Sequence, residues 1–306
     1  MKFFVSGLVN IETTVSVNEF PIKYYPIDYP FFGVNSNVSG VGFNISKALN
    51  TLGNEVYFSS LTGNDDEAER IEKTLKRENI PRNSIIKSLK NTPVSVVLYD
   101  NNGKRQIYCD LKDIQEHSLR LENVKNELLK ADIAVLCNIN FNRGLIKEAK
   151  KLSKLTACDV HVLSDINDDY NKDFMENSDI LFMSDEALPC PAEEFIKLIE
   201  DKYHNRIIVI GMGSNGAMML DGEKQKIYQL EAFKTDKIIN TVGAGDALFS
   251  AFLHFYAKSG SPLLSLKKAE IFAAVKIGCN GASVGFSDEK TIETLYNSSK
   301  IVVTEL

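Results

Sequence analysis

A group of small residues followed by an acid is the part of the sequence best suited to chemistry. Gly243, Ala244 and Gly245 run directly into Asp246, and a strongly apolar segment follows. If that segment is a helix, the N–H groups of its first turn lack partners within the helix, and the glycines allow them to converge on an anion. A phosphate that gains negative charge during a reaction is the expected guest, with Asp246 placed to accept a proton from an attacking hydroxyl. The alternative, that Asp246 only caps the helix, leaves the two glycines without explanation.

The apolar segment after Asp246 predicts a buried helix. Its apolar residues would lie nearly all round the helix rather than along one stripe. No G-x-x-x-x-G-K-[ST] phosphate loop occurs in the sequence, so any ATP must be held by another arrangement.

A second glycine motif, GMGSNG at 211–216, matches the dinucleotide pattern G-x-G-x-x-G and follows an apolar run typical of a strand. A dinucleotide site needs a helix next, but the chain continues with AMMLDGEKQKIYQL, two apolar runs around an Asp-Gly turn. The pattern favours a hairpin over a nicotinamide-dependent oxidoreductase, and leaves open a turn that touches a nucleotide.

A third motif, SGVGFN at 39–44, stands directly before a helix expected over 44–53. Gly40 and Gly42 permit a close approach of the backbone to another group, and Asn44 offers both a donor and an acceptor. An N-capped helix after a flexible turn explains the same residues equally well.

Strand and helix patterns alternate along most of the chain, which predicts a parallel sheet covered by helices. The expected strands are 3–9, 55–61, 133–139, 159–166, 179–184 and 206–213, and the expected helices are 44–53, 65–79, 142–155 and 191–203. Two parts do not fit this rhythm. Segment 11–17 alternates and is β-branched, and 93–110 is a pair of alternating runs around Asp100-Asn101-Asn102-Gly103, which indicates a hairpin. These parts predict a small β-sheet that lies on the α/β body as a lid, within a single domain over 1–306.

The composition excludes several classes of protein. The chain has 306 residues, 44% hydrophobic and 25% charged, and its net charge of −6 argues against general binding to nucleic acid or anionic membranes. The five cysteines include no C-x-x-C pair, so neither a disulfide framework nor a zinc site is expected, and a reducing cytoplasm is the simplest location. The N-terminus MKFFVSGLVN is typical of a strand rather than a signal peptide, and no run approaches the ~18 apolar residues of a membrane span.

The run NTVGAGDALFSAFL (240–253) resembles the C-terminal signature of the ribokinase-like (PfkB) family of sugar and nucleoside kinases. Other segments follow in the family's order: GLVNIETT (7–14), SGVGFNISKALNTLG (39–53), TGNDDEAERIEKTLKRENI (62–80) and the hairpin at 92–110. The resemblance covers nearly the whole chain. It implies a three-layer α/β/α body with a mostly parallel sheet, and a small β-sheet lid formed by about 11–38 and 92–112. It also implies an ATP- and Mg2+-dependent kinase that phosphorylates a hydroxyl of a small sugar or nucleoside.

The resemblance assigns a role to each motif. Asp246 would be the catalytic base, and the backbone of Gly243, Ala244 and Gly245 would form the anion hole. The residues expected to face the acceptor are Asn10, Glu12, Gly40, Gly42 and Asn44. Those expected near ATP are Ser184, Gly213, Gly216 and, beside the adenine, Asn280. The lid would exclude water from the reaction.

Some positions depart from the family pattern. Glu12 stands where the sugar-binding Asp is expected, and Ser39 replaces the first of two paired glycines. The metal-related N-x-x-E motif should follow 179–184, where we expect Ser184 in place of the Asn and Asp185 or Glu186 in place of the acid. These changes keep open a ligand-binding member that has lost phosphoryl transfer, although the intact Gly-Ala-Gly-Asp favours the enzyme.

Within the family, the sequence looks most like the pseudouridine kinases. The shared features are GVGFNI at 40–45, the lid segment 91–103, CNI at 137–139 and the Asn that opens the signature, Asn240. Asn138 is therefore expected to meet a polar edge of a uracil ring, unless it only caps the turn after its strand. Ribose, fructose, a deoxysugar acid and other nucleosides remain alternative acceptors.

The lid also predicts association with a second copy of the chain. Its alternating strands leave apolar faces that the lid of a second subunit would cover, so a homodimer through the lid is expected. The resemblance adds a monovalent cation such as K+ as an optional activator.

Overall fold

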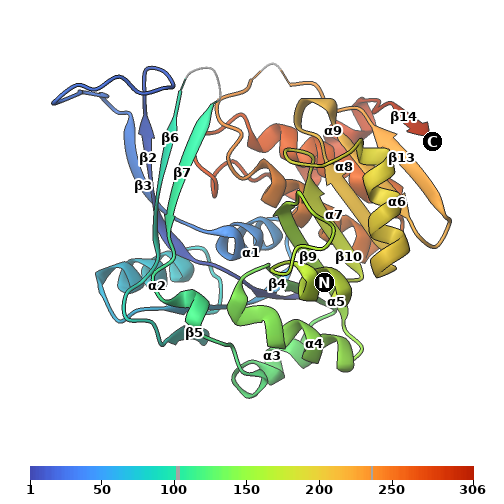
Figure 1. The fold of residues 1–306 in the computed structure, drawn as a ribbon, viewed down its shortest axis with the longest axis horizontal. Helices are drawn as coiled ribbons and strands as arrows, with labels where there is room; N and C mark the ends of the chain where they lie inside the picture. The colour runs from blue at the N-terminus through green and yellow to red at the C-terminus, as the bar shows by residue number, and fades with distance from the viewer. Residues whose placement is uncertain (101–103, 236) are drawn as a thin grey trace.

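The central feature of the computed structural model, which describes residues 1–100, 104–235 and 237–306, is a large twisted sheet (Figure 1). Its strand order is β14-β13-β12-β11-β10-β9-β8-β1-β4-β5. The parallel strands are β1 (Lys2–Ser6), β4 (Glu55–Thr62), β5 (Ser84–Lys87), β8 (Ile133–Leu136), β9 (Leu155–Val162), β10 (Ile180–Ser184) and β11 (Ile207–Gly211). The antiparallel extension is β12 (Ala217–Asp221), β13 (Lys226–Leu230) and β14 (Val303–Glu305).

Helices cover both faces of this sheet, because successive side chains of a strand point to opposite sides. In β1, Phe3 and Val5 pack into one core and Phe4 into the other. The first core holds α1 (Val41–Thr51), α2 (Asp66–Arg77), α7 (Ala244–Ser259), α8 (Pro262–Lys276) and α9 (Glu289–Ser298). The second holds α3 (Lys125–Lys130), α4 (Arg143–Lys151), α5 (Lys172–Asn177) and α6 (Ala192–Tyr203). Short 3-10 turns lie at Ile114–Glu116, Leu121–Asn123, Asn140–Asn142 and Gly213–Asn215. The expected three-layer α/β/α body is confirmed.

A separate small sheet, here called the lid sheet, has the strand order β3-β2-β6-β7 and projects from the body (Figure 1). Its strands are β2 (Asn10–Ser16), β3 (Val34–Ser39), β6 (Val94–Tyr99) and β7 (Arg105–Asp110). β6 and β7 pair antiparallel, as the hairpin pattern predicts, while the turn residues 101–103 lie outside the described part of the chain.

The sequence misplaced the boundaries of several elements. Helix α1 begins at Val41 rather than 44, because Gly40 (φ 103) turns the chain and the next residues are already helical. Strand β9 spans Leu155–Val162 rather than 159–166, and the helix before it ends at Lys151 rather than 155. The buried polar residue Thr156 hides the start of this strand from an apolar pattern.

The G-x-G-x-x-G motif lies in a hairpin, as expected. The turn Gly213–Asn215 follows β11, and β12 then runs back antiparallel to it. No helix in the described part of the chain has both the length and the apolar composition that crossing a membrane requires.

Candidate active site

The N-terminus of α7 has the backbone that an anion site needs. Gly243 is its N-cap, with a left-handed φ of 79°, and no side chain caps the helix. A Cβ at position 243 would lie 2.6 Å from the carbonyl oxygen of Ala282, so glycine is required there. The N–H of Ala244 donates to the carbonyl of Thr241 at 3.1 Å, while those of Gly245 and Asp246 have no acceptor in the described part of the chain and are available to a ligand.

The carboxylate of Asp246 lies in this first turn and is buried. Nδ2 of Asn44 donates a hydrogen bond to its Oδ2 at 2.7 Å. Burial raises the pKa of Asp246, while the charge of a protonated His161 and the Asn44 hydrogen bond act in the opposite direction. Asp246 is the third residue of α7 rather than its N-cap, and its carboxylate accepts from a side chain of α1. A buried carboxylate with a raised pKa is a better proton acceptor, as a general base must be.

Helix α1 delivers Asn44 to this carboxylate because its first turn packs on the connection between β1 and β2. The N–H of Gly42 donates to the carbonyl of Leu8 at 3.0 Å. A Cβ at Gly42 would lie 2.5 Å from the carbonyl carbon of Gly7, and one at Gly40 would lie 2.6 Å from the oxygen of Leu8. The close approach that these glycines permit is therefore to the chain's own backbone.

Strand β2 brings Asn10 and Glu12 to the same region, as alternate residues on one face. Nδ2 of Asn10 donates to Oγ of Ser95 at 2.9 Å. Its Oδ1 is buried and has no hydrogen-bond partner among the residues that the structure describes. A buried acceptor of this kind is costly unless a ligand donates to it, which suits a substrate hydroxyl.

Glu12 interacts electrostatically with the carboxylate of Asp246. Burial raises the pKa of Glu12, a hydrogen bond with Ser39 opposes that rise, and the negative charge of Asp246 adds to it. Ser39 also lies 3.4 Å from Oδ1 of Asn44. The structure thus joins the predicted residues of β2, α1 and α7 in one cluster.

Sequence reasoning missed charged residues that belong to this cluster. An oxygen of Asp159 would lie 4.0 Å from a Cβ at Gly245, so this carboxylate flanks the first turn of α7. The N–H of His161 donates to Asp159 at 2.8 Å, and Nδ1 of His161 lies 3.6 Å from the same carboxylate. His161 has a φ of 60°, where β9 loses its register with β10. An acid inside an otherwise apolar strand is the signal that could have identified Asp159.

Lys276 is the other residue that was missed. It ends α8, is fully buried, and donates a hydrogen bond to the carbonyl of Val242, directly before the N-cap of α7. A lysine within an apolar helical run was its only sequence signal.

Asn138 and Asn280 lie in different settings. Nδ2 of Asn138 donates to the carbonyl of Val160 at 3.3 Å and to Oδ1 of Asn171 at 3.1 Å, so its amide group is engaged within the protein. Oδ1 of Asn280 accepts from Asn240 at 3.0 Å, which places it beside the loop that leads to the anion hole.

Of the residues expected near the nucleotide, Ser184, Gly213 and Gly216 lie at the ends of β10 and β11. Ser184 is in register with Gly211, and the turn Gly213–Asn215 follows directly. A Cβ at Gly216 would lie 2.0 Å from the oxygen of Leu230, so this glycine is required by the packing of the hairpin itself.

The carboxylates near the site indicate how the protein would accommodate Mg2+. Glu186 is exposed and forms an ion pair with Arg105 of the lid at 3.4 Å. Within residues 1–100, 104–235 and 237–306, no group of three or more His, Cys, Asp or Glu side chains could hold a metal ion. Mg2+ usually binds one or two carboxylates together with substrate phosphates and water, so the chain fits Mg2+ that arrives on ATP. Asp159 places one carboxylate beside Gly245, at this end of α7.

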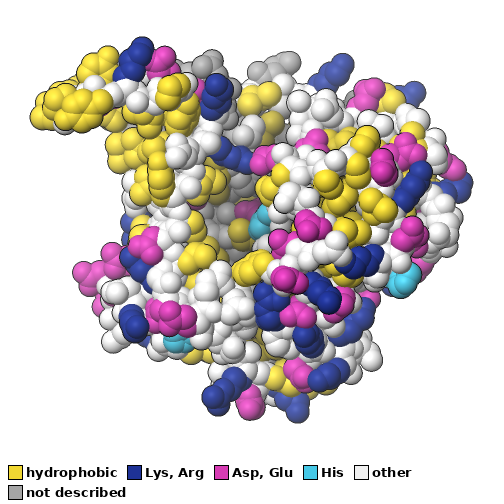
Figure 2. Space-filling view, in the orientation of Figure 1, with side chains coloured by type: hydrophobic (Ala, Val, Ile, Leu, Met, Phe, Trp, Pro, Cys, Tyr) yellow, Lys and Arg dark blue, Asp and Glu magenta, His cyan; other side chains and the backbone are white. Residues whose placement is uncertain are grey.

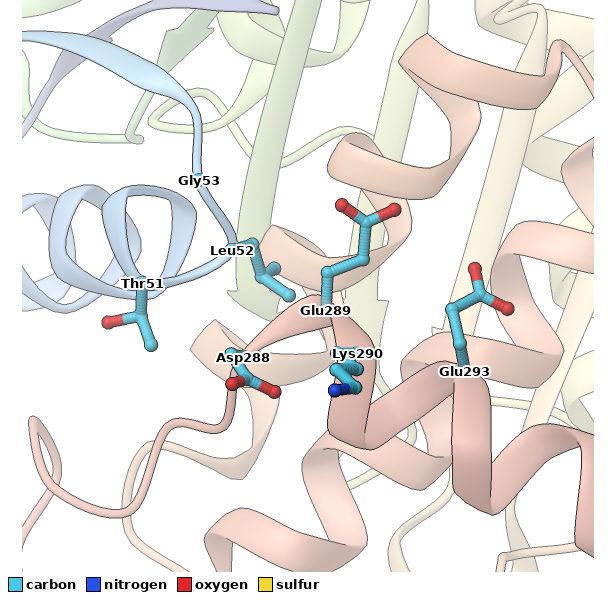
Figure 3. A pocket seen from close by; sticks show the side chains of 7 residues that line it. All are labelled: Thr51, Leu52, Gly53, Asp288, Glu289, Lys290 and Glu293. Atoms are coloured by element: carbon cyan, nitrogen blue, oxygen red, sulfur yellow. The ribbon is translucent and has the colours of Figure 1, made fainter.

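The molecular surface is hollowed between the lid sheet and the body (Figure 2). A different hollow, of about 510 Å³, lies at the opposite end of α1 (Figure 3). Its lining residues are Thr51, Leu52, Gly53, Asp288, Glu289, Lys290 and Glu293. Three acids against one lysine do not suit a triphosphate. Thr51 is also about 10 Å along the helix axis from Asn44, so we do not place the active site there.

Known proteins share both the sequence and the architecture. The profile described as pfkB family carbohydrate kinase matches residues 5–289. A ribokinase of Dictyostelium discoideum is 22% identical over 330 residues, which cover 94% of this chain and 98% of that protein. The fructosamine kinase of Bacillus subtilis is 22% identical over 268 residues, which cover 88% and 92%. In structure, a microbiome-derived acarbose kinase matches with a TM-score of 0.88 at 21% identity, over 97% of this chain and 98% of that one.

The profile match spans most of the chain and includes both the Asn44 helix and the Gly-Ala-Gly-Asp turn. The solved structure shares the fold. The chain belongs to the pfkB family of carbohydrate kinases and is a phosphotransferase with an alcohol group as acceptor.

Proposed function

We propose that this kinase transfers the γ-phosphate of Mg·ATP to a hydroxyl of a sugar or nucleoside, with Asp246 as the base. The observation that carries the proposal is the buried Asp246 carboxylate, bonded to Asn44, in the first turn of a helix with a glycine N-cap. Proton acceptor and anion site therefore stand side by side, as phosphoryl transfer from ATP to an alcohol requires.

The residues divide the reaction between them. The acceptor hydroxyl gives its proton to Asp246 as its oxygen bonds to the γ-phosphorus, and the bond from that phosphorus to the ADP oxygen breaks. The N–H groups at the start of α7 stabilise the charge on the transferring group. Mg2+ bound to ATP would neutralise part of the phosphate charge.

The acceptor is held by β2 and α1. The buried Oδ1 of Asn10 accepts from one hydroxyl, and Glu12 accepts from another. Pseudouridine is a candidate on the sequence resemblance. The NH2 group of Asn138 already donates within the protein, so only its carbonyl oxygen would meet a base. Ribose, fructose, a deoxysugar acid and other nucleosides are the alternatives.

We also propose a homodimer through the lid and a location in the cytoplasm. The outer face of the lid sheet exposes Val34, Val96 and Tyr108, on the side opposite Asn10 and Glu12. The cysteines are free in the structure, which suits a reducing compartment where ATP is abundant.

The test is ADP release from Mg·ATP with pseudouridine, uridine, adenosine, ribose, fructose and 2-keto-3-deoxygluconate, each with and without K+. A strong response to one compound supports the kinase and names its acceptor class. Silence across the panel, with ATP binding shown by calorimetry, favours a binding protein that has lost phosphoryl transfer. One observation favours that second candidate. Glu186, which was expected to replace the metal-related acid, forms an ion pair with Arg105 instead.

A further inference from the structure

A charged side chain lies entirely inside the protein behind the anion hole. Lys276 has 0% of its surface exposed. Lysine is almost never fully buried without partners, because removing its charge from water is costly. Its Nζ donates to the carbonyl oxygen of Val242, the residue before the N-cap of α7.

The titratable and charged groups around this ammonium come from several elements. Asp246 of α7 and Glu12 of β2 favour its charged form, as does Cys279, while Arg105 of β7 disfavours it. Burial outweighs these groups and lowers the pKa of Lys276 to about 8. Asp246 raises the pKa of Glu12, Asp159 raises that of Asp246, and Lys276 opposes the rise at both Glu12 and Asp246. One buried cation therefore acts on the buried carboxyl group of Asp246 and on the half-buried one of Glu12.

The same end of α8 holds the loop that leads into the anion hole. The N–H groups of Ile239 and Asn240 donate to the carbonyl of Ile277 at 2.9 and 3.1 Å. The N–H of Val242 donates to Oδ1 of Asn240 at 2.8 Å. Backbone hydrogen bonds therefore hold the start of this loop to the end of α8, and the hydrogen bond from the Lys276 ammonium to Val242 holds its end.

We propose that Lys276 is a positioning residue for phosphoryl transfer: its ammonium holds the anion-hole loop through Val242 and allows Asp246 and Glu12 to be ionised side by side. The proposal rests on the proposed function. Two neighbouring buried carboxyl groups without a cation do not both ionise, since the first charge raises the pKa of the second. Loss of the cation therefore protonates the base and frees the loop together.

The test compares Lys276→Met with Lys276→Arg. In Lys276→Met we expect kcat to fall by about 10- to 100-fold, with KM for ATP changed by less than about threefold, and the acidic limb of the pH profile to move to higher pH. In Lys276→Arg the charge is kept at all accessible pH values, so activity is retained, and the loss of rate that we expect near pH 8 in the wild type moves to higher pH.

Lys268→Met is the matched control on the same helix. Lys268 pairs with Glu293 at 2.6 Å, so its loss removes a charge contact from α8 while kcat and the pH profile stay as in the wild type. A folded Lys276→Met with wild-type kcat and acidic limb overturns the proposal. If Lys276→Met does not fold, Lys276→Arg provides the test. An alkaline limb of its pH–rate profile at the wild-type position would also overturn the proposal.

A readout independent of turnover separates this proposal from the kinase proposal. Folding lowers the pKa of Lys276 from 10.5 to about 8. Between these two pH values the unfolded chain therefore binds more protons than the folded protein, and the free energy of unfolding rises with pH. The difference in melting temperature between wild type and Lys268→Met should stay constant there, while that between wild type and Lys276→Arg should grow. A wild type without kinase activity contradicts the proposed function, and a constant Lys276→Arg difference contradicts the buried cation.

Discussion

One amide and one carboxylate, 202 residues apart in the chain, decide how well this site accepts a proton. Burial raises the pKa of Asp246 and favours its protonated form. The hydrogen bond from Asn44 favours the ionised form, which the proposed base needs.

Asn44→Ala should therefore move the acidic limb of kcat/KM upward by about one pH unit, because the pKa of Asp246 rises when a hydrogen bond to its ionised form is lost. The measurement is a pH–rate profile. The control is Asn50→Ala on the same helix, which removes a bond from Asn50 to the carbonyl of Glu78 at 2.9 Å and should leave the limb in place. An equal shift in both variants, or none in either, would show that the bond to Asp246 does not set the profile.

The sequence identified the residues whose role follows from a local motif. Asp246, Asn44 and Glu12 stand in short patterns, and the structure brings all three together. Lys276 and His161 were not found, because their position depends on burial at a helix end and on a bulge in β9. Neither feature leaves a periodic trace in the sequence.

At the scale of an element, the loop before α7 depends on a glycine at its N-cap. In Gly243→Ala the alanine would have to adopt a left-handed φ of 79°, and its Cβ would lie 2.6 Å from the carbonyl oxygen of Ala282. We expect kcat/KM to fall by about 10²-fold or more, since the anion hole loses its geometry.

Gly260→Ala is the control for this prediction. Gly260 ends the same helix with a φ of 65°, and a Cβ there would meet nothing within 4 Å. It should lower the free energy of unfolding by about 1 kcal/mol and leave kcat unchanged. Steady-state kinetics and thermal unfolding check both variants; wild-type activity in Gly243→Ala would show that the loop tolerates displacement.

Element identities were predictable where periodicity was strong. The buried helix α7 and the hairpin β12–β13 both follow from simple patterns. β9 was misplaced because the helical pattern was carried on to residue 155, although Ser153 turns the chain with a φ of 55° and the strand begins at Leu155. A single left-handed residue of this kind leaves no periodic trace in the sequence.

At the scale of the whole molecule, the lid carries a surface that the body does not cover. The arm between β2 and β3, residues 17–33, exposes Tyr24, Phe31 and Phe32 at 88%, 85% and 101%. Figure 2 shows apolar side chains gathered at this projecting end of the molecule. Its charged residues are Glu19, Lys23 and Asp28, so little net charge opposes the approach of a second copy.

We expect sedimentation velocity to show a dimer that the double substitution Phe31→Ser, Phe32→Ser converts to a monomer, because the lost apolar area drives association. The control is Leu198→Ser on α6, an exposed apolar residue (42%) of the body, which should remain dimeric. A wild-type monomer at micromolar concentration would rule out the lid dimer.

The central claim is that Asp246 is the base of a phosphoryl transfer, and the most direct test is ADP release by Asp246→Asn beside the wild type, with the acceptor found in the panel. The account predicts that turnover falls by about 10²- to 10⁴-fold, since general base catalysis is lost. The affinity for ATP, measured by calorimetry on both proteins, should change little. Turnover at the wild-type rate in Asp246→Asn would contradict the account.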